Sequence, residues 1–263
     1  MREEYLGFET LREAIEISDF FDEAILLEDA ESSNDFAKNV IERNQNFRTA
    51  IIVVNRQSKG RGRQNKSWIS EYGSCLTFSF VISSRDFSLS DYSSLVCAKA
   101  LHSALLSYEE ILRANNLSIK WPNDIYAGEK KIAGILVENI YREERLDRQV
   151  VGIGLNFASE HFDSEDLKDA GSIRSVYGFT PELNELFLRI IRALDETLRE
   201  KDFDYGYLNN YSYLYGKPIL WKNGQSEVKA TALELTEKGE LKILTEEGEY
   251  KKVFSGTIAL NSF

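Results

Sequence analysis

Apolar and polar residues alternate along several short segments of the chain. In residues 76–82, apolar side chains alternate with Thr77 and Ser79, which is the period of two that is typical of a β-strand. Further apolar runs of strand length lie at 50–54, 118–121, 131–140 and 149–157. The charged run 141–148 between the last two predicts a solvated turn.

Three other segments have the apolar spacing of helices. Residues 34–43 gather apolar side chains on one face, with Ser33 as a candidate N-cap. Residues 95–112 carry the stripe of one long helix, and the clearest stripe runs through 183–198. Residues 1–25 are amphipathic and acidic, and we expect them to be helical in part.

The texture of the chain changes from about residue 216. Short strand-like pieces alternate there with turn signals, namely Asn223-Gly224, Lys238-Gly239 and Glu247-Gly248. We therefore expect a small antiparallel, barrel-like β module at 216–263. The pattern divides the chain into an N-terminal extension (1–27), a main domain (28–215) and this C-terminal module (216–263).

Composition and charge narrow the possible functions. Hydrophobic residues make up 43% and charged residues 29% of the chain, as in ordinary globular proteins. The net charge of -11 would repel DNA overall. The acidic N-terminus lacks a secretory signal, and no run approaches the ~20 apolar residues that span a bilayer. Cys75 and Cys97 are expected to be reduced thiols in a cytosolic protein.

The segment 60–68 (GRGRQNKSW) combines glycines with positive charge. Its glycines allow backbone N–H groups to approach a ligand closely, and Arg61 and Arg63 suit phosphate or carboxylate oxygens. Trp68 could stack on a base. A flexible surface loop or an RNA-binding Arg-Gly segment has the same composition. The lack of a repeat and the flanking apolar strands favour a ligand-binding loop.

The segment 120–124 (KWPND) places two polar side chains where a strand must stop. Pro122 ends the strand, so Asn123 and Asp124 fall at its end, where α/β sheets present functional groups. They could orient Mg²⁺–ATP or an incoming amine. An ordinary turn beside a buried tryptophan is the commoner structure for such a pentapeptide taken alone.

Two apolar segments, 131–138 (KIAGILVE) and 152–156 (GIGLN), carry glycines inside strands. Such glycines leave a strand face bare and fit close approach by a flat ligand. Lys131 is either a snorkelling surface residue or a cation that projects into a site. The segment 152–156 lacks the third glycine and the following helix of a dinucleotide-binding fingerprint.

Taken in order, these segments resemble the catalytic domain of biotin–protein ligases. The segment 31–34 (ESSN) is similar to that family's Ser-Thr-Asn segment, Gln57 matches a glutamine before the loop, and 255–258 resembles its C-terminal strand. The resemblance spans about 28–263. It implies an α+β fold in which a mixed β-sheet with flanking helices, of the class II synthetase and biotin–lipoate ligase type, precedes a small SH3-like β-barrel.

The resemblance also implies an activity and a set of site residues. Biotin's carboxylate attacks the α-phosphate of ATP to give biotinyl-5′-AMP, and a lysine of a biotin carboxyl carrier protein or domain then takes the biotin. The implied catalytic residues are Lys131, Arg61, Arg63 and Asp124. The implied biotin-binding residues are Ser32, Ser33, Asn34, Gln57, Gly60, Arg61, Gly62, Arg63, Lys131, Gly134, Gly152 and Gly154. The implied ATP-binding residues are Arg61, Arg63, Trp68, Asn123, Lys131 and Asn156. Mg²⁺ would arrive with the ATP phosphates, with Asp124 as a candidate ligand.

The chain departs from the family pattern at several positions. Ser33 replaces a threonine but keeps the hydroxyl, whereas Asn65 and Lys66 replace a glycine and an arginine, and Lys59 replaces a small residue. Only about 27 residues precede the region of resemblance, which begins near residue 28, and this is fewer than the roughly 60 of a domain that folds alone. With the acidic charge, this predicts a monofunctional cytoplasmic ligase without DNA or membrane partners and without repressor activity. Such a ligase could form a weak homodimer.

Two other functions remain open at this point. A lipoate–protein ligase resembles the same fold and chemistry, although 60–63 and 120–124 favour biotin. A biotin-sensing or RNA-binding module without catalysis is the alternative from another class. The presence of Lys131 and of both loop arginines favours catalysis.

Overall fold

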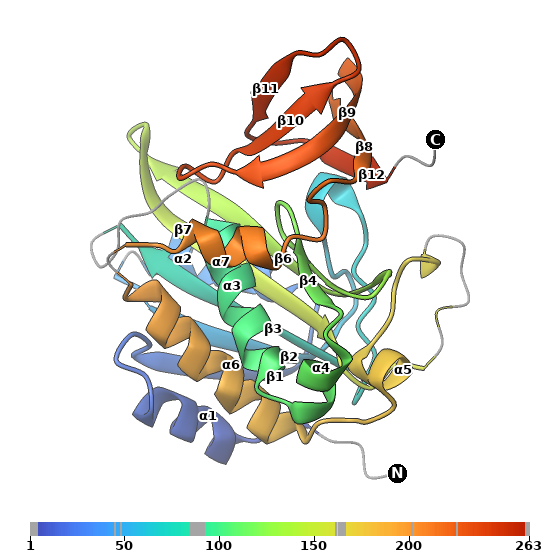
Figure 1. The fold of residues 1–263 in the computed structure, drawn as a ribbon. Helices are drawn as coiled ribbons and strands as arrows, with labels where there is room; N and C mark the ends of the chain where they lie inside the picture. Colours follow the sequence, from blue (N-terminus) through green and yellow to red (C-terminus); the bar gives the residue numbers. More distant parts are fainter. Residues whose placement is uncertain are drawn as a thin grey trace.

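The computed structural model describes most of the chain. The described residues are 5–44, 46–47, 49–84, 93–160, 162, 167–200, 202–224 and 226–260. They form a larger part around one β-sheet and a smaller sheet formed by the C-terminal strands, which lies above it in Figure 1.

The larger sheet has seven strands in the order β1-β2-β3-β7-β6-β5-β4. The strands are β1 (Glu23–Ala30), β2 (Ala50–Gln57), β3 (Cys75–Ser83), β4 (Leu117–Lys120), β5 (Asp124–Ala127), β6 (Lys130–Arg142) and β7 (Arg145–Asn156). The β1–β2 pair is parallel and the other pairs are antiparallel. The mixed sheet with flanking helices confirms the predicted α+β class.

Helices cover the two faces of this sheet unequally. The helices are α1 (Phe8–Glu16), α2 (Ser33–Arg43), α3 (Ser93–Leu106), α4 (Glu109–Ala114), α5 (Ile173–Tyr177), α6 (Leu183–Leu198) and α7 (Tyr205–Asn210). The main core includes buried residues of α1, α3 and α6 on one face. A second cluster joins Ala37 and Ile41 of α2 to Val81 and Val150 on the opposite face. Beyond α2, this face of the sheet carries a cavity over β6 and β7.

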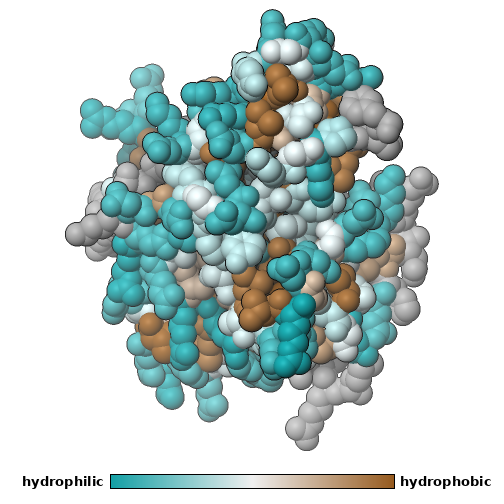
Figure 2. Space-filling model, in the orientation of Figure 1, coloured by the Kyte–Doolittle hydropathy of each residue, from teal (hydrophilic) through white to brown (hydrophobic). Residues whose placement is uncertain are grey.

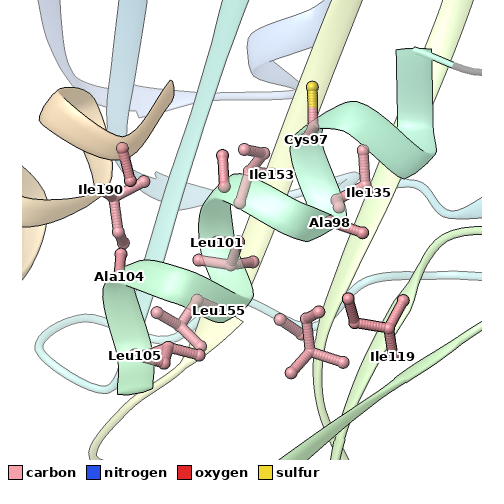
Figure 3. Packing of buried hydrophobic residues seen from close by; sticks show 14 of the residues in the cluster. Cys97, Ala98, Leu101, Ala104, Leu105, Ile119, Ile135, Ile153, Leu155 and Ile190 are labelled. Carbon is pink, nitrogen blue, oxygen red and sulfur yellow. The ribbon is translucent and has the colours of Figure 1, made fainter. Parts of the chain in front are cut away.

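The packing of α3 shows why its face of the sheet is fully occupied. Leu101 and Leu105 of α3 lie against Ile153 and Leu155 of β7 (Figure 3). Because strand side chains alternate between faces, the residues between them, including Gly154, point to the other face. The alternating pattern at 76–82 has the same result in β3, where Phe78 and Phe80 enter the core.

The structure differs from the predicted elements in three places. The stripe at 95–112 is two helices, because the chain turns after Leu106 and α4 begins at Glu109. The charged run 141–148 is mostly strand, with a two-residue turn at Glu143 and Glu144, whose φ angles are 50° and 64°. The N-cap of α2 is Ser32, which accepts a hydrogen bond from the backbone N–H of Asp35, and not Ser33.

The C-terminal strands form a five-stranded antiparallel sheet in the order β11-β10-β9-β8-β12. They are β8 (Pro218–Asn223), β9 (Ser226–Leu235), β10 (Leu241–Thr245), β11 (Tyr250–Val253) and β12 (Thr257–Leu260). The predicted turns are confirmed, and Gly224, Gly239 and Gly248 have positive φ angles of 60°, 76° and 83°. This sheet agrees with the expected SH3-like module.

The proposed domain boundaries stay predictions. The segment before residue 28 contains α1 and the start of β1, and its Leu6, Leu11 and Ala14 are buried in the main core.

Polar residues cover most of the face seen in Figure 2, with hydrophobic residues in small groups. In the described part of the chain, no helix has the length and apolar character needed to cross a membrane.

Replacing Leu101 with alanine tests the α3 packing. Leu101 is fully buried, so Leu101→Ala should lower the free energy of unfolding by about 2–5 kcal/mol. Leu112→Ala is the matched control, because Leu112 of α4 is 57% exposed and surface changes usually stay within about 0.5 kcal/mol. Urea unfolding measures both. Equal losses for the two variants would contradict this account of the core.

Candidate functional site

A cavity of about 1410 Å³ opens on the sheet face that α2 leaves uncovered. Its walls come from the start of α2, the loop 60–68, the turn between β4 and β5, strands β6 and β7, and β12 of the C-terminal sheet. Except for Gly60, every residue that the sequence predicted for the site lines this cavity. Gly60 lies at the base of the loop. The fold therefore brings together residues that are far apart in the sequence.

One end of the cavity is a network of small polar side chains. Gln57, at the end of β2, accepts hydrogen bonds through Oε1 from the Ser33 backbone N–H (2.7 Å) and from Ser33 Oγ (3.1 Å). Ser79 Oγ lies 2.6 Å from both Ser33 Oγ and Asn34 Oδ1. Ser32, which caps α2, completes this wall. The network holds several polar groups in fixed directions at the start of α2.

The floor of the cavity is formed by glycines on two paired strands. Gly134 of β6 lies directly opposite Gly154 of β7, and the indole of Trp68 lies over both. A Cβ atom at Gly154 would come within 2.4 Å of Trp68 Cε2, and one at Gly134 within 3.3 Å of Trp68 Cζ3. A Cβ atom at Gly152 would meet Asn34 Oδ1 at 2.4 Å. The glycines thus make room for two side chains that themselves border the cavity.

The loop 60–68 is an ordered small hairpin. The Trp68 backbone N–H donates to the Gly60 carbonyl (2.8 Å), and the Gly62 N–H donates to the Lys66 carbonyl (2.7 Å). Gln64 lies at the turn with a φ angle of 55°. A Cβ atom at Gly60 would come within 2.4 Å of the Trp68 carbonyl oxygen. This geometry favours a built ligand loop over a flexible Arg-Gly segment.

A lysine and an aspartate form the charged centre of the cavity. Lys131 Nζ lies 2.6 Å from Asp124 Oδ1, and both side chains are mostly buried. The same ammonium group lies 5.9 Å from the centre of the Trp68 ring. Lys131 therefore points into the site and is not a snorkelling surface residue.

The two loop arginines point to different walls. Arg63 donates to Asn123 Oδ1 (3.2 Å) and to the Gly256 carbonyl (3.3 Å). Burial lowers the pKa of Arg63, and the nearby Asp124 carboxylate acts in the opposite direction. Arg61 instead contacts Asp35 (2.5 Å) and Glu138 of β6 (3.4 Å). Arg63 thus ties the loop to the C-terminal sheet, and Arg61 ties it to α2.

Two predicted amides are held by the fold. Asn123 Nδ2 donates to the Ile135 carbonyl (2.8 Å), and Asn156 Nδ2 donates to the Gly171 carbonyl (3.0 Å). Asn156 Oδ1 accepts from the Cys75 thiol at 3.1 Å. Cys75 and Cys97, both in the described part of the chain, are buried free thiols. In contrast, the buried Trp68 Nε1 has no hydrogen-bond partner among the described residues.

The sequence reasoning missed several residues of the site. Ser79 and Glu138 contact predicted residues directly, and both stand in segments already assigned to strands. Their alternation with core residues could have placed them on the cavity face. Gly256 and Thr257 contact Arg63 and Gln64 from the C-terminal sheet. That contact depends on how the two sheets are arranged, which no local pattern indicates.

Metal binding has limited support from side chains alone. The described residues contain no group of three or more histidine, cysteine, aspartate or glutamate side chains that could hold a metal ion. Asp124 lies at the cavity wall but is paired with Lys131. A magnesium ion here would depend mainly on oxygens supplied by a ligand.

Known proteins share this fold and these segments. Residues 27–156 match the Biotin/lipoate A/B protein ligase family. A biotin protein ligase from Aquifex aeolicus in complex with biotin and ATP is 29% identical, with a TM-score of 0.76 over 92% of this chain and 99% of that one. The chain therefore belongs to the biotin and lipoate protein ligase family.

Curated relatives point to the biotin branch of this family. The bifunctional ligase/repressor BirA of Bacillus spizizenii is 26% identical over 244 residues, which are 90% of this chain and 74% of the relative. A biotin–[acetyl-CoA-carboxylase] ligase of Paracoccus denitrificans is 32% identical over 138 residues, which are 52% of each chain. The chain thus spans only part of these relatives.

Substituting Gly154 tests the position of Trp68. Gly154→Ala should displace the indole, because the added methyl group would lie 2.4 Å from Trp68 Cε2. Tryptophan emission should shift to the red and iodide quenching should rise, with Trp68→Phe identifying the contribution of this residue. Gly62→Ala is the control, since its nearest atom would be 3.6 Å away. Unchanged emission and quenching in Gly154→Ala would show that Trp68 does not lie on this floor.

Proposed function

We propose that this protein is an ATP-dependent biotin–protein ligase. The observation that carries the proposal is one cavity that joins three features: the polar network of Ser33, Asn34 and Gln57, a glycine floor, and the Lys131–Asp124 pair. A flat, neutral ring system fits the first two features, and an anionic group fits the third. Biotin and ATP combine these chemical properties, and the Aquifex relative binds both.

The polar end of the cavity is assigned to the biotin head group. Ser32, Ser33, Asn34 and Gln57 surround this end, and the hydrogen bonds among them fix their donors and acceptors before a ligand arrives. Such preorganised polar groups give specificity within a mostly shape-defined pocket. Gly60 and Gly62 shape the loop over this pocket, and the floor glycines (Gly134, Gly152 and Gly154) keep its base free of side chains.

The charged centre is assigned to the reacting groups. Biotin's carboxylate oxygen forms a bond to the α-phosphorus of ATP, and pyrophosphate leaves with the electron pair of the broken P–O bond. Lys131, Arg61 and Arg63 offset the negative charge that develops, and Asp124 holds Lys131 in place. No covalent enzyme intermediate is required, so catalysis depends on positioning and charge.

The adenylate and the nucleotide are assigned to the wall around Trp68. Its indole is available for stacking, and its Nε1–H group has no partner among the described residues. Asn123 and Asn156 line the same region, where their bonds to the fold keep them rigid. Mg²⁺ is proposed to enter with the ATP phosphates, with Asp124 as a candidate ligand.

The second half-reaction defines the partner. The acceptor lysine amine attacks the biotinyl carbonyl, AMP leaves, and an amide bond forms. We propose the biotin carboxyl carrier protein or domain of a carboxylase as the acceptor, in line with the Paracoccus relative's acetyl-CoA carboxylase. The two buried free thiols suit the cytoplasm as the compartment. A weak homodimer and the lack of a DNA partner remain proposals.

An exchange assay tests the function. The protein is incubated with Mg-ATP, labelled pyrophosphate and either biotin or lipoate, and incorporation of label into ATP is measured. We expect exchange with biotin, followed by labelling of an acceptor domain. Exchange with lipoate alone would make the chain a lipoate ligase. Biotin binding without exchange would leave a sensing module.

Lys131 offers the sharpest test of the chemistry. Lys131→Ala should slow adenylation by about 10²–10³-fold, the usual effect of losing one preorganised group. Lys130→Ala is the matched control, because the neighbouring Lys130 is exposed and donates to the Lys168 carbonyl outside the charged centre. Single-turnover formation of biotinyl-AMP measures the rate. An unchanged rate in Lys131→Ala would remove this lysine from the reaction.

A further inference from the structure

Glu138 of β6 lies between two parts of the site that have separate roles. Its Oε2 accepts a hydrogen bond from Asn34 Nδ2 at 2.8 Å. Its Oε1 lies 2.8 Å from Lys38 Nζ and 3.4 Å from an Arg61 guanidinium nitrogen. One carboxylate therefore contacts both the polar end of the cavity and the loop that covers it.

On the cavity side, Glu138 determines how the Asn34 amide is turned. An ionised carboxylate only accepts hydrogen bonds, so it must face the NH₂ group of Asn34. The Asn34 oxygen then faces Ser79 Oγ at 2.6 Å. This orientation sets which donor and which acceptor the amide can offer to a ligand.

On the loop side, Glu138 belongs to a group of four alternating charges. Lys38 contacts Asp35 (2.9 Å) as well as Glu138, and Arg61 contacts the same two carboxylates. Burial alone would lower the pKa of Lys38, but Glu138 and Asp35 outweigh it and the pKa is raised. The side chain of Glu138 is 25% exposed and that of Arg61 38%. Such a partly buried network holds a loop more firmly than an isolated surface pair does.

We propose that Glu138 is a positioning residue that couples the biotin-contacting Asn34 to the closed position of the loop 60–68. This inference rests on the proposed function, because it takes the Asn34 end of the cavity as the biotin pocket. A ligand that fixes Asn34 also fixes Glu138, and the ordered carboxylate favours the bound position of Arg61. By linkage, closing the loop strengthens biotin binding by the same factor.

Glu138→Gln separates the two contacts. Glutamine keeps an oxygen that can accept from Asn34, but its NH₂ group would face the donors of Lys38 and Arg61. We expect Glu138→Gln to keep the Asn34 contact but to release the loop, so that biotin binds more weakly by the factor that loop closure contributes. Trypsin cleavage after Arg61 and Arg63 measures the loop, and biotin should protect the wild type but protect Glu138→Gln much less.

Glu138→Ala removes both contacts. It should weaken biotin binding by about tenfold, or about 1.4 kcal/mol, because Asn34 loses the partner that holds its amide, and it should also expose the loop. Arg61→Ala combined with Glu138→Gln completes a double-mutant cycle, and the two changes should be non-additive in the rate of cleavage after Arg63, a site that all four proteins keep. Glu31→Gln is the matched control, because Glu31 pairs with Lys59 at the base of the same loop through an exposed contact of 2.7 Å.

The outcomes separate this inference from the proposed function. Wild-type tryptic protection by biotin together with unchanged protection in Glu138→Gln would overturn the coupling. Additive effects in the cycle would do the same. If the wild type does not bind biotin, the function fails, but cleavage without ligand still tests the Glu138–Arg61 contact, which should make the loop of Glu138→Gln more susceptible than that of Glu31→Gln. Thermal unfolding of each variant shows whether the fold is kept.

Discussion

The site depends on the absence of side chains at three positions of two paired strands. Gly134 and Gly154 lie opposite each other, and Gly152 lies two residues before Gly154 on β7, opposite Leu136. Because their neighbours fill the core under α3 and α6, these glycines must point to the other face, where they leave a hollow. Trp68 and Asn34 occupy part of it. The glycines therefore make room for Trp68 of the loop 60–68 and for Asn34 at the start of α2.

Charge is arranged around this hollow in two ways. Lys131 and Arg61 contact carboxylates, which hold both side chains in direction. The hydrogen-bond partners of Arg63 among the described residues are instead a neutral amide and a carbonyl, and burial lowers its pKa. An anionic ligand that reached Lys131 or Arg61 would therefore share each cation with the carboxylates already bound to it. Those hydrogen-bond partners of Arg63 are neutral, and the carboxylate that acts on its charge is that of the nearby Asp124.

The sequence predicted the parts of the site that depend on local pattern. The alternation of apolar residues predicted β3, β6 and β7, and the glycines inside β6 and β7 predicted a bare face on these strands. Pro122 correctly predicted that β4 ends before Asn123 and Asp124. The sequence did not predict β1, whose residues are all exposed or partly exposed and show no clear alternation, or β5, which has only four residues. It also did not predict Glu138 or Ser79 as contacts, because a strand pattern gives the face of a residue but not its neighbour across the cavity. Asn65 and Lys66 remain departures from the family pattern in a loop whose backbone is nevertheless ordered.

The C-terminal sheet is part of the site because it fixes two of its walls. Gly256 accepts from Arg63, Thr257 donates to Gln64, and the Gly239 carbonyl accepts from Trp121 Nε1 at 3.0 Å. Any other residue would be strained at Gly256, since its φ angle is 129° and a Cβ atom would lie 2.5 Å from Trp221 Nε1. Arg63 and the turn before Asp124 therefore both contact the C-terminal sheet. The C-terminal sheet thus supports both Arg63 and the turn that carries Asn123, as suits the proposed reaction, which works by positioning.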